Sequence, residues 1–429
     1  MIRGSSGSLV LKLTNTALSL ILAIVLARVL GPEGYGIYAF AFSVVSLLSI
    51  PMQVGLPTLL VREVARYQLY EQWSLLRGLL KYANIVSILL AAIIVPVSVA
   101  VIWFVFRNPE DNAPRQLLTF YWALALAPLI ALGGLRGAAL RGLRKVVQGQ
   151  LPDMLLRPGL LLVLTLVVAL SADLTPERTM ALHALAAALA FAAGAHLLNR
   201  HLPSSVRQCS PSYERLAWLR SVIPLSLLAG MQAINGQIDI VMLGIMTTTK
   251  EEVGVYRVVV QGATLVTFGL AAANMVVAPH FARLYRAGDR ENLQALVTTS
   301  SRWILALALP VGLTLIFFGQ FLLMILFGRE YLSGYLALSI LCTGQLANAA
   351  CGSVGYLLAM TGYENDALMG RVIAISINVA LNVALIPLFG IYGAATATAI
   401  SLIILNVYMC FCVNSRMGIH CGAFRFKNA

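Results

Sequence analysis

The sequence predicts an all-α polytopic membrane protein with about twelve transmembrane helices. Of its 429 residues, 59% are hydrophobic and only 11% are charged, whereas roughly 25% of the residues in a soluble domain are charged. Apolar runs of about 18 or more residues, long enough for a helix to cross a bilayer, recur throughout the chain. The runs are continuous and do not alternate every second residue, which favours helices over the strands of a barrel.

The spans are expected between polar or Gly/Pro-containing turns. The apolar run after Ser8 continues to Leu30 without a cleavage motif, so we expect a retained first span and no signal peptide. The predicted spans cover roughly residues 9–30, 36–57, 80–104, 116–136, 153–171, 179–198, 219–246, 254–279, 303–327, 334–360, 368–388 and 391–413.

Lysine and arginine are unevenly distributed between the two sides of these spans. With a cytoplasmic N-terminus, the inner segments hold 23 of the 30 basic residues and the outer segments hold 7. This bias predicts that both termini are cytoplasmic. It also accounts for the net charge of +13, so nucleic acid is not an expected partner. The six cysteines form no Cys-x-x-Cys pair and no histidines lie at metal-ligand spacing, so we expect no metal and no cofactor.

A short turn separates the first two apolar runs. Between Ala27 and Tyr38 the chain contains three glycines and one proline, residues that end helices and permit tight reversals. We therefore predict a membrane hairpin. At a shift of 218 residues, Gly36-Ile37-Tyr38 corresponds to Gly254-Val255-Tyr256, and both motifs open an even-numbered predicted span.

This repeat predicts two six-helix lobes with the same orientation, at residues 1–198 and 219–413. A cytoplasmic linker is expected at 199–218 and a cytoplasmic tail at 414–429. Transporters use such repeats to place a binding site between two halves that rock against each other.

Residues 58–81 form a separate amphipathic segment, with Leu59, Leu60 and Val64 opposite Arg62 and Arg66. We expect a helix on the cytoplasmic surface, with an ordinary polar loop as the alternative.

Four motifs in a fixed order resemble those of Wzx-type polysaccharide and O-antigen flippases. This family belongs to the multidrug/oligosaccharidyl-lipid/polysaccharide exporter superfamily, and the twelve predicted spans argue against its lipid II flippase branch. In chain order the motifs are Arg28-Val29-Leu30-Gly31-Pro32 with Tyr35-Gly36 and Tyr38, Gly55-Leu56-Pro57 with Arg62-Glu63-Val64-Ala65-Arg66, Arg136-Gly137-Ala138-Ala139-Leu140-Arg141-Gly142, and Asp239-Ile240-Val241-Met242-Leu243-Gly244 with Gly254-Val255-Tyr256.

The resemblance implies two six-helix lobes in a V around a central cavity. It implies a flippase that moves an undecaprenyl-diphosphate-linked oligosaccharide, such as an O-antigen or exopolysaccharide repeat unit of lipopolysaccharide or polysaccharide biosynthesis, to the outer leaflet by alternating access. The expected location is the bacterial inner (plasma) membrane. No cofactor is implied, although some relatives couple transport to an H⁺ or Na⁺ gradient. Expected partners are the lipid-linked oligosaccharide, membrane lipid, and the polysaccharide polymerase with its chain-length machinery.

Arginine is suited to a diphosphate, because its guanidinium binds phosphate oxygens in pairs and remains charged. We expect Arg28 and Arg257, at the outer ends of their spans, to face the cavity and contact the diphosphate. Snorkelling to the interface is the alternative. Five further basic residues either receive the diphosphate from the cytoplasmic side or act only as topology charges; they are Lys12, Arg62, Arg66, Arg136 and Arg141.

Asp239 is the one acidic residue assigned to the interior of a predicted span, which makes it the ion-coupling candidate. A structural pair with Arg28 or Arg257 is the alternative. Asn235 lies one turn before Asp239, and Asn378 lies one turn before Asn382. Asparagine and glutamine within the spans either contact sugars or hold helices together. This set comprises Asn15, Asn235, Gln261, Asn274, Gln345, Asn348, Asn378 and Asn382.

Three other functions compete with the flippase. An ion-coupled multidrug exporter would need acidic groups for cationic drugs, and the predicted spans contain one acid and many arginines. A membrane enzyme of polysaccharide assembly would need a large outer loop or a His/Asp site, and the five histidines are scattered. A scaffold would have no need of polar residues within its spans. We therefore expect a transporter and not an enzyme.

Overall fold

The computed structural model describes residues 2–105, 113–171, 173–247 and 249–423, and this part of the chain contains helices and no strand. The chain divides into two compact units, Met1–Gln237 and Ile238–Ala429. The division falls within α9 (Arg215–Met246), which therefore contributes to both units. It does not coincide with the predicted linker at 199–218, and the assignment of six-helix lobes stays a prediction.

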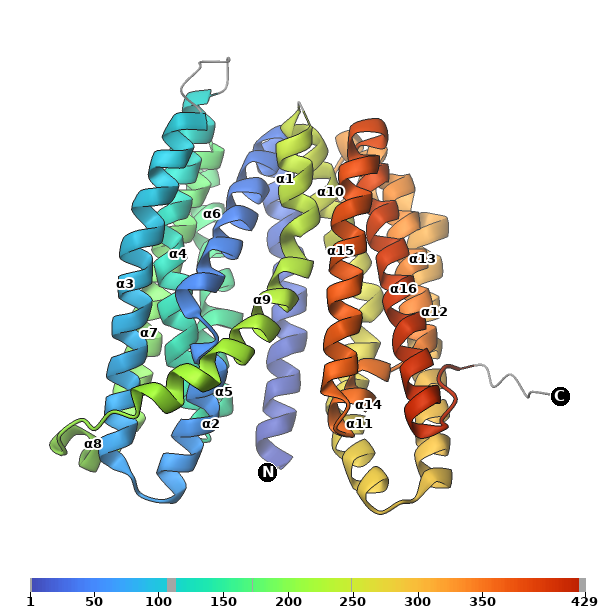
Figure 1. Cartoon of the computed structure of the whole chain (residues 1–429). Helices are drawn as coiled ribbons and strands as arrows, with labels where there is room; N and C mark the ends of the chain where they lie inside the picture. Colours follow the sequence, from blue (N-terminus) through green and yellow to red (C-terminus); the bar gives the residue numbers. More distant parts are fainter. Residues whose placement is uncertain (1, 106–112, 172, 248, 424–429) are drawn as a thin grey trace. The chain divides into compact units, whose positions relative to one another are not determined.

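The first unit begins with α1 (Ile2–Gln53), which is helical on either side of Gly31. Gly31 has φ 67° and ψ 173°, a conformation that favours glycine. The two arms of α1 run in different directions from this residue (Figure 1), which confirms the predicted turn. The unit continues with α2 (Leu56–Leu69), α3 (Trp73–Val105), α4 (Ala113–Gly142), α5 (Val146–Leu151), the π-helix η1 (Pro152–Leu156), α6 (Arg157–Ala169), α7 (Pro176–His201) and α8 (Ser204–Gln208).

The second unit contains two interrupted helices where continuous spans are predicted. The predicted span 254–279 is broken by the 3₁₀-helix η2, and the predicted span 334–360 bends by 42° between Cys351 and Val354. The elements are α10 (Lys250–Ala263), η2 (Thr264–Thr267), α11 (Phe268–Arg286), α12 (Arg290–Leu326), the 3₁₀-helix η3 (Arg329–Gly334), α13 (Tyr335–Cys351), α14 (Val354–Met360), α15 (Glu364–Phe389) and α16 (Ile391–Met417).

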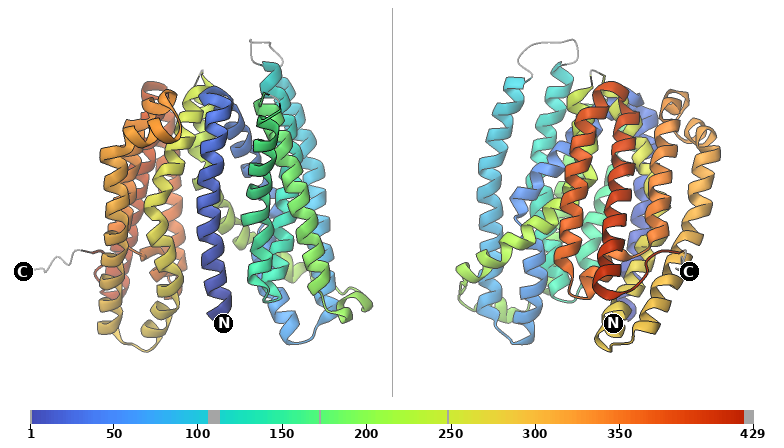
Figure 2. Two further views of the ribbon diagram at one scale, coloured as in Figure 1. Left: turned by 180° about the vertical axis from the view of Figure 1, so that it is seen from behind. Right: turned by 45° about the vertical axis from the view of Figure 1, so that its right-hand side comes forward.

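Many of these helices are long and apolar enough to cross a membrane. The described residues contain nine such helices, or up to ten if the bent pair is one span. Within each unit the long helices run side by side (Figure 2). This number is below the predicted twelve for two reasons. The helix α1 counts once although it holds the first two predicted spans, and the predicted span 219–246 contributes only a shorter apolar helix, Ile234–Met246. The chain is thus an all-helical, multi-pass membrane protein, and the twelve-helix arrangement remains a proposal.

The amphipathic segment predicted at 58–81 is two elements and not one. α2 ends at Leu69, and Glu71 has a left-handed φ of 55° before α3 begins at Trp73. Within α2 the predicted apolar face is correct, because Leu59, Leu60 and Val64 are buried. This face packs with α3, α4 and the start of α9 in one hydrophobic core of the first unit.

Glycines allow neighbouring helices to approach closely in both units. A Cβ atom on Gly137 of α4 would be 2.5 Å from the carbonyl oxygen of Gly149 of α5, and the reverse distance is also 2.5 Å. In the second unit, α16 packs against α13, α14 and α15, and Gly344 of α13 lies against Ala399 of α16. Small residues at such positions let membrane helices approach closely.

Candidate functional site

A buried carboxylate is the centre of the candidate site in the second unit. Asp239, near the end of α9, is 9% exposed. Asn382 Nδ2 on α15 donates a hydrogen bond to Asp239 Oδ1 over 2.7 Å, and Thr398 Oγ1 on α16 donates to Oδ2 over 2.5 Å. Tyr256 Oη on α10 lies 3.5 Å from the same Oδ2. Three helices therefore direct polar side chains at a carboxylate carried by a fourth, α9.

The sequence positions of these four residues explain why they meet. Asp239 and Asn382 each lie seven residues before the end of their helix, while Tyr256 and Thr398 lie six and seven residues after the start of theirs. At a rise of about 1.5 Å per residue, all four are about 10 Å from a helix end. Antiparallel neighbours with matching ends bring such residues to one level.

Asn378 extends the cluster by one helical turn. Asn382 Nδ2 also donates to Asn378 Oδ1 over 3.1 Å, and Asn378 Nδ2 lies 3.4 Å from Thr398 Oγ1. Both asparagines are at least 98% buried. These i, i+4 residues are therefore in contact with each other, and their role as sugar contacts or as helix–helix contacts stays a prediction. Asn382 Oδ1 is buried and has no hydrogen-bond partner among the described residues.

The cluster has the chemistry of a site for a proton or a hard cation. Carboxylate, amide and hydroxyl oxygens are the ligands that hard cations prefer. Within the described residues Asp239 makes no ion pair with a lysine or arginine. The pairing with Arg257 considered as an alternative is therefore not formed. A carboxylate inside a membrane helix without a basic partner can be neutralised by a bound proton or metal ion.

Sequence reasoning missed two members of the cluster and included one residue outside it. The sequence around Thr398 and Tyr256 did not mark them as site residues. Thr398 follows a run of small residues, and Tyr256 stood out only through the Gly254-Val255-Tyr256 repeat. Their role depends on partners far away in the sequence. Asn235, predicted to share a face with Asp239, is exposed, whereas Asp239 is buried.

Two arginines of α4 lie within a candidate membrane span, Arg115–Gly142. Arg136 Nη1 donates to the Leu132 carbonyl over 2.8 Å, and its guanidinium lies 4.0 Å from the centre of the Phe191 ring. The Arg141 side chain runs back along α4, so that its Nη1 is 3.4 Å from where a Gly137 Cβ would be. Neither forms an ion pair with a carboxylate in the described part of the chain.

The remaining predicted cations are dispersed. Arg28 is exposed on the first arm of α1, three residues before Gly31, and Lys12 is half-buried on the same arm. Arg257 is half-buried on α10 of the second unit, next to Tyr256. Within the described residues of the second unit, Arg257 makes no hydrogen bond or ion pair with the Asp239 carboxylate, which is bonded to Asn382 and Thr398. The contact of Lys12 and Arg257 with a diphosphate, like that of Arg28, stays a prediction.

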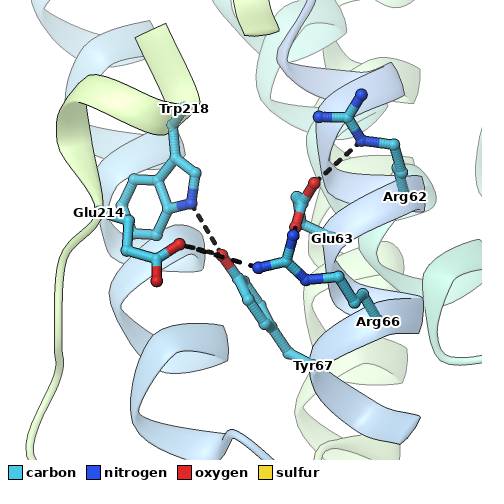
Figure 3. Close-up of polar contacts among 6 residues, drawn as sticks. All are labelled: Arg62, Glu63, Arg66, Tyr67, Glu214 and Trp218. Carbon is cyan, nitrogen blue, oxygen red and sulfur yellow. Dashed lines mark hydrogen bonds and ion pairs between the residues drawn. The ribbon is translucent and has the colours of Figure 1, made fainter. Parts of the chain in front are cut away.

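Arg62 and Arg66 form part of a polar network on α2 (Figure 3). The Glu63 side chain, 6% exposed, lies 2.9 Å from Arg62 Nε and 3.2 Å from Arg66 Nη1. The two guanidiniums are half-exposed. Because Glu63 neutralises part of their charge, they attract an anion less strongly than two unpaired arginines would.

The same network joins α2 to the beginning of α9. Trp218 Nε1 donates to Tyr67 Oη over 2.9 Å, and Tyr67 Oη donates to Glu214 Oε2 over 3.2 Å (Figure 3). Tyr67 and Trp218 are almost fully buried. Burial raises the pKa of the Tyr67 phenol, and the hydrogen bond from Trp218 opposes this rise. Tyr285, which the shift of 218 residues relates to Tyr67, contacts a different kind of partner, Tyr363 Oη, at 3.1 Å.

One acidic residue was placed wrongly from the sequence. The fifth span was predicted to begin at residue 153, which left Asp153 at the cytoplasmic surface. The candidate span is Val146–Ala169, so Asp153 lies inside it. The error arose because Pro152 reads as a helix boundary, whereas the chain continues through it as the π-helix η1. Asp153 therefore lies seven residues after the start of a continuous helical stretch and not at its boundary.

Comparison with known proteins finds a matching family and relatives that are described as membrane proteins or as proteins of glycan biosynthesis. A family model described as polysaccharide biosynthesis protein matches residues 1–285. The probable low-salt glycan biosynthesis flippase Agl15 of Haloferax volcanii is 25% identical over 186 residues, which cover 42% of this chain and 39% of that protein. An uncharacterized membrane protein of Methanocaldococcus jannaschii is 25% identical over 220 residues, covering 49% and 43%. The matched regions span less than half of either relative.

Two solved structures share the fold. An inward-facing multidrug resistance MATE family transporter of the MOP superfamily has a TM-score of 0.73 at 15% identity, covering 96% of this chain and 98% of that one. The lipid II flippase MurJ, in an inward closed conformation, has a TM-score of 0.73 at 13% identity, covering 96% and 88%. At these identities the likeness establishes the fold. Because the family model covers more than half of the sequence, the chain belongs to the polysaccharide biosynthesis protein family.

Proposed function

We propose that the protein is a flippase that moves an undecaprenyl-diphosphate-linked oligosaccharide from the inner to the outer leaflet by alternating access. The observation that carries this proposal is the pair Arg136 and Arg141. Both lie in a membrane-spanning helix, and neither has a carboxylate partner among the described residues. Family membership and the probable glycan flippase among the relatives support the same function.

Charge separates this function from its rivals. A diphosphate cannot cross the hydrocarbon region unless its charge is compensated. Arginines in a water-accessible interior meet this demand, because each guanidinium binds two phosphate oxygens without a proton transfer. The oligosaccharide needs hydroxyl and amide partners, and the lipid tail can remain in the bilayer. A cationic drug would be repelled by the same arginines.

Transport against a gradient requires a coupling ion, and Asp239 is the candidate carrier. We propose that it binds H⁺ or Na⁺ with the help of Asn382, Thr398 and Tyr256, whose hydrogen bonds hold the carboxylate in place.

Arg28 and Arg257 are proposed to contact the diphosphate at the outer ends of their spans. The proposal also places the protein in the bacterial inner membrane with cytoplasmic termini, working with a polysaccharide polymerase and its chain-length machinery.

Complementation of a strain that lacks its own glycan flippase tests the proposal. The wild-type chain and Arg115→Gln should restore glycan at the cell surface, because Arg115 is exposed at the other end of α4. The double variant Arg136→Gln/Arg141→Gln should reduce surface glycan at least tenfold at equal protein abundance, since it removes both cations. Full restoration by the double variant would show that these arginines do not bind the diphosphate.

A multidrug exporter is the second candidate, because the MATE transporter shares this fold over nearly the whole chain. The same cells distinguish the two functions. A drug exporter lowers the accumulation of cationic dyes and raises drug resistance without restoring the glycan. We expect no change in dye accumulation on expression of the wild-type chain.

A further inference from the structure

We propose that Asp153 and Gln53 form a subsite for sugar hydroxyl groups of the transported molecule, next to the arginines of α4. The inference rests on the proposed function and assigns the part of the first unit that recognises the glycan. It depends on how α5 and η1 pack along α4, on the two glycines that these side chains face, and on the lack of a hydrogen bond or ion pair at either side chain among the described residues.

The α4–α5 contact sets the position of Asp153. The backbones of α4 and α5 meet at Gly137 and Gly149, because neither residue has a side chain that would hold them apart. Asp153 lies four residues after Gly149, and Gly133 lies four residues before Gly137. Four residues are about one helical turn. In two antiparallel helices, one turn forward along the first and one turn back along the second reach the same height along the shared axis. Accordingly, Asp153 Oδ1 is 3.5 Å from where a Gly133 Cβ would be.

Gln53 reaches the adjacent position from a different helix. It is the last residue of α1, and its Oε1 is 3.2 Å from where a Gly134 Cβ would be. The consecutive glycines of α4 thus leave room for a carboxylate and an amide beside one stretch of helix. Gly133 lies nine residues before the end of α4 at Gly142, which places this pair about 13 Å along the helix axis from that end.

Both side chains keep their hydrogen-bonding groups available in the described part of the chain. Among the described residues, Asp153 and Gln53 make no hydrogen bond and no ion pair, and both are partly exposed. A carboxylate and an amide that face lipid carry a large energetic cost, so these partly exposed groups are suited to contact with water or a polar ligand. Together they accept and donate hydrogen bonds, as sugar hydroxyls require.

The local backbone and the neighbouring charge support a binding role. Asp153 lies in a π-helical turn, and such turns within longer helices are frequently found at functional sites. Arg141 interacts electrostatically with Asp153 but lies outside ion-pair distance. A diphosphate held at Arg141 would therefore carry its first sugar toward Asp153 and Gln53, which is the order of groups in a sugar diphosphate.

Binding to two matched probes tests the subsite. The probes are undecaprenyl diphosphate alone and undecaprenyl-diphosphate-linked oligosaccharide extracted from the source strain. Affinity is measured with purified protein in detergent from the ligand-dependent shift in unfolding temperature. Wild type should bind the glycan-bearing probe about tenfold or more tightly than the bare carrier. Asp153→Asn, which keeps the shape of the side chain, and Gln53→Ala should reduce this ratio severalfold while affinity for the bare carrier is kept.

Two controls separate the subsite from the proposed function. Asp173→Asn, in the loop before α7, should keep the wild-type ratio, and Arg141→Gln should weaken binding of both probes. If wild type binds both probes but Asp153→Asn and Gln53→Ala keep its preference, the subsite is refuted and the flippase proposal stands. If wild type binds the two probes equally, the subsite is again refuted. Failure of wild type to bind either probe would refute both proposals.

Discussion

Asn382 donates a 2.7 Å hydrogen bond to Asp239 across 143 residues of sequence. This bond ties α15 to the end of α9, and the buried amide oxygen of Asn382 has no hydrogen-bond partner in the described part of the chain. The contact therefore orients the carboxylate and keeps an additional oxygen available. Both features are expected of a site that binds and releases a small cation.

Asp239→Asn should abolish stimulation of transport by an ion gradient while leaving the fold intact, because asparagine keeps the shape but loses the negative charge. The measurement is the rate of lipid-linked glycan translocation in vesicles with an imposed pH or Na⁺ gradient. Wild type should respond to one of the two gradients. Asp289→Asn is the matched control, since Asp289 caps α12 outside the candidate spans and asparagine caps a helix equally well. A gradient response in Asp239→Asn would exclude this residue from coupling.

Thr398→Val should destabilise the protein by about 1–2 kcal/mol, because a buried carboxylate oxygen loses its shortest donor. Thr398→Ser keeps the hydroxyl and should restore most of the loss. Unfolding midpoints in detergent, compared between the two variants, check this. Equal stability of Val and Ser at position 398 would show that the 2.5 Å bond does not hold the site together.

Tyr67→Phe should lower the unfolding free energy by about 1–2 kcal/mol at pH 8, because Trp218 loses its acceptor and Glu214 loses a donor. Burial holds the pKa of Tyr67 above its ordinary value of 10.0. This contribution to stability is complete below pH 10 and declines as pH rises through the native pKa.

The stability difference between wild type and Tyr67→Phe should therefore shrink above pH 10. Unfolding midpoints measured from pH 8 to pH 11.5 test the trend. Tyr70→Phe serves as the control, because Tyr70 is 66% exposed at the end of the same helix. A difference that stays constant or grows above pH 10 would contradict the assignment.

Gly137→Ala should destabilise the first unit by about 1–3 kcal/mol, because the added Cβ would lie 2.5 Å from the carbonyl oxygen of Gly149. Gly236→Ala should be neutral or slightly stabilising, since nothing lies within 4 Å of its Cβ position and alanine favours a helix. Unfolding midpoints of the two variants check the glycine contact that positions Asp153. Equal midpoints would mean that α4 and α5 can separate without cost.

Local sequence signals predicted the features that depend on local chemistry. The reversal at Gly31, the buried face of α2 and the pair Asn378 and Asn382 all follow from spacing and from residue type. Asp239 stood out because an acid within an apolar run is costly. Interruptions of helices were less predictable, because an interruption such as η2 at Thr264–Thr267 occurs inside apolar sequence and leaves no mark in its composition.

Features that depend on tertiary contacts could not be predicted. Thr398 and Tyr256 join Asp239 only through the packing of α16 and α10, and Glu63 pairs with two arginines because α2 buries it. Asp153 was misplaced because a proline before it normally ends a helix, whereas here the chain winds through a π-helix. In each case the deciding contact is made by a residue on another helix or by a turn that the local sequence disfavours.

Translocation in reconstituted vesicles tests the central claim most directly. Vesicles are loaded with undecaprenyl-diphosphate-linked oligosaccharide, and a membrane-impermeant sugar-binding probe reports its appearance in the opposite leaflet. The account predicts gradient-stimulated exposure with wild-type protein, at least tenfold less with Arg136→Gln/Arg141→Gln, and only the unstimulated rate with Asp239→Asn. Exposure no faster than in protein-free vesicles, with correctly folded wild-type protein and an imposed gradient of either ion, would contradict it.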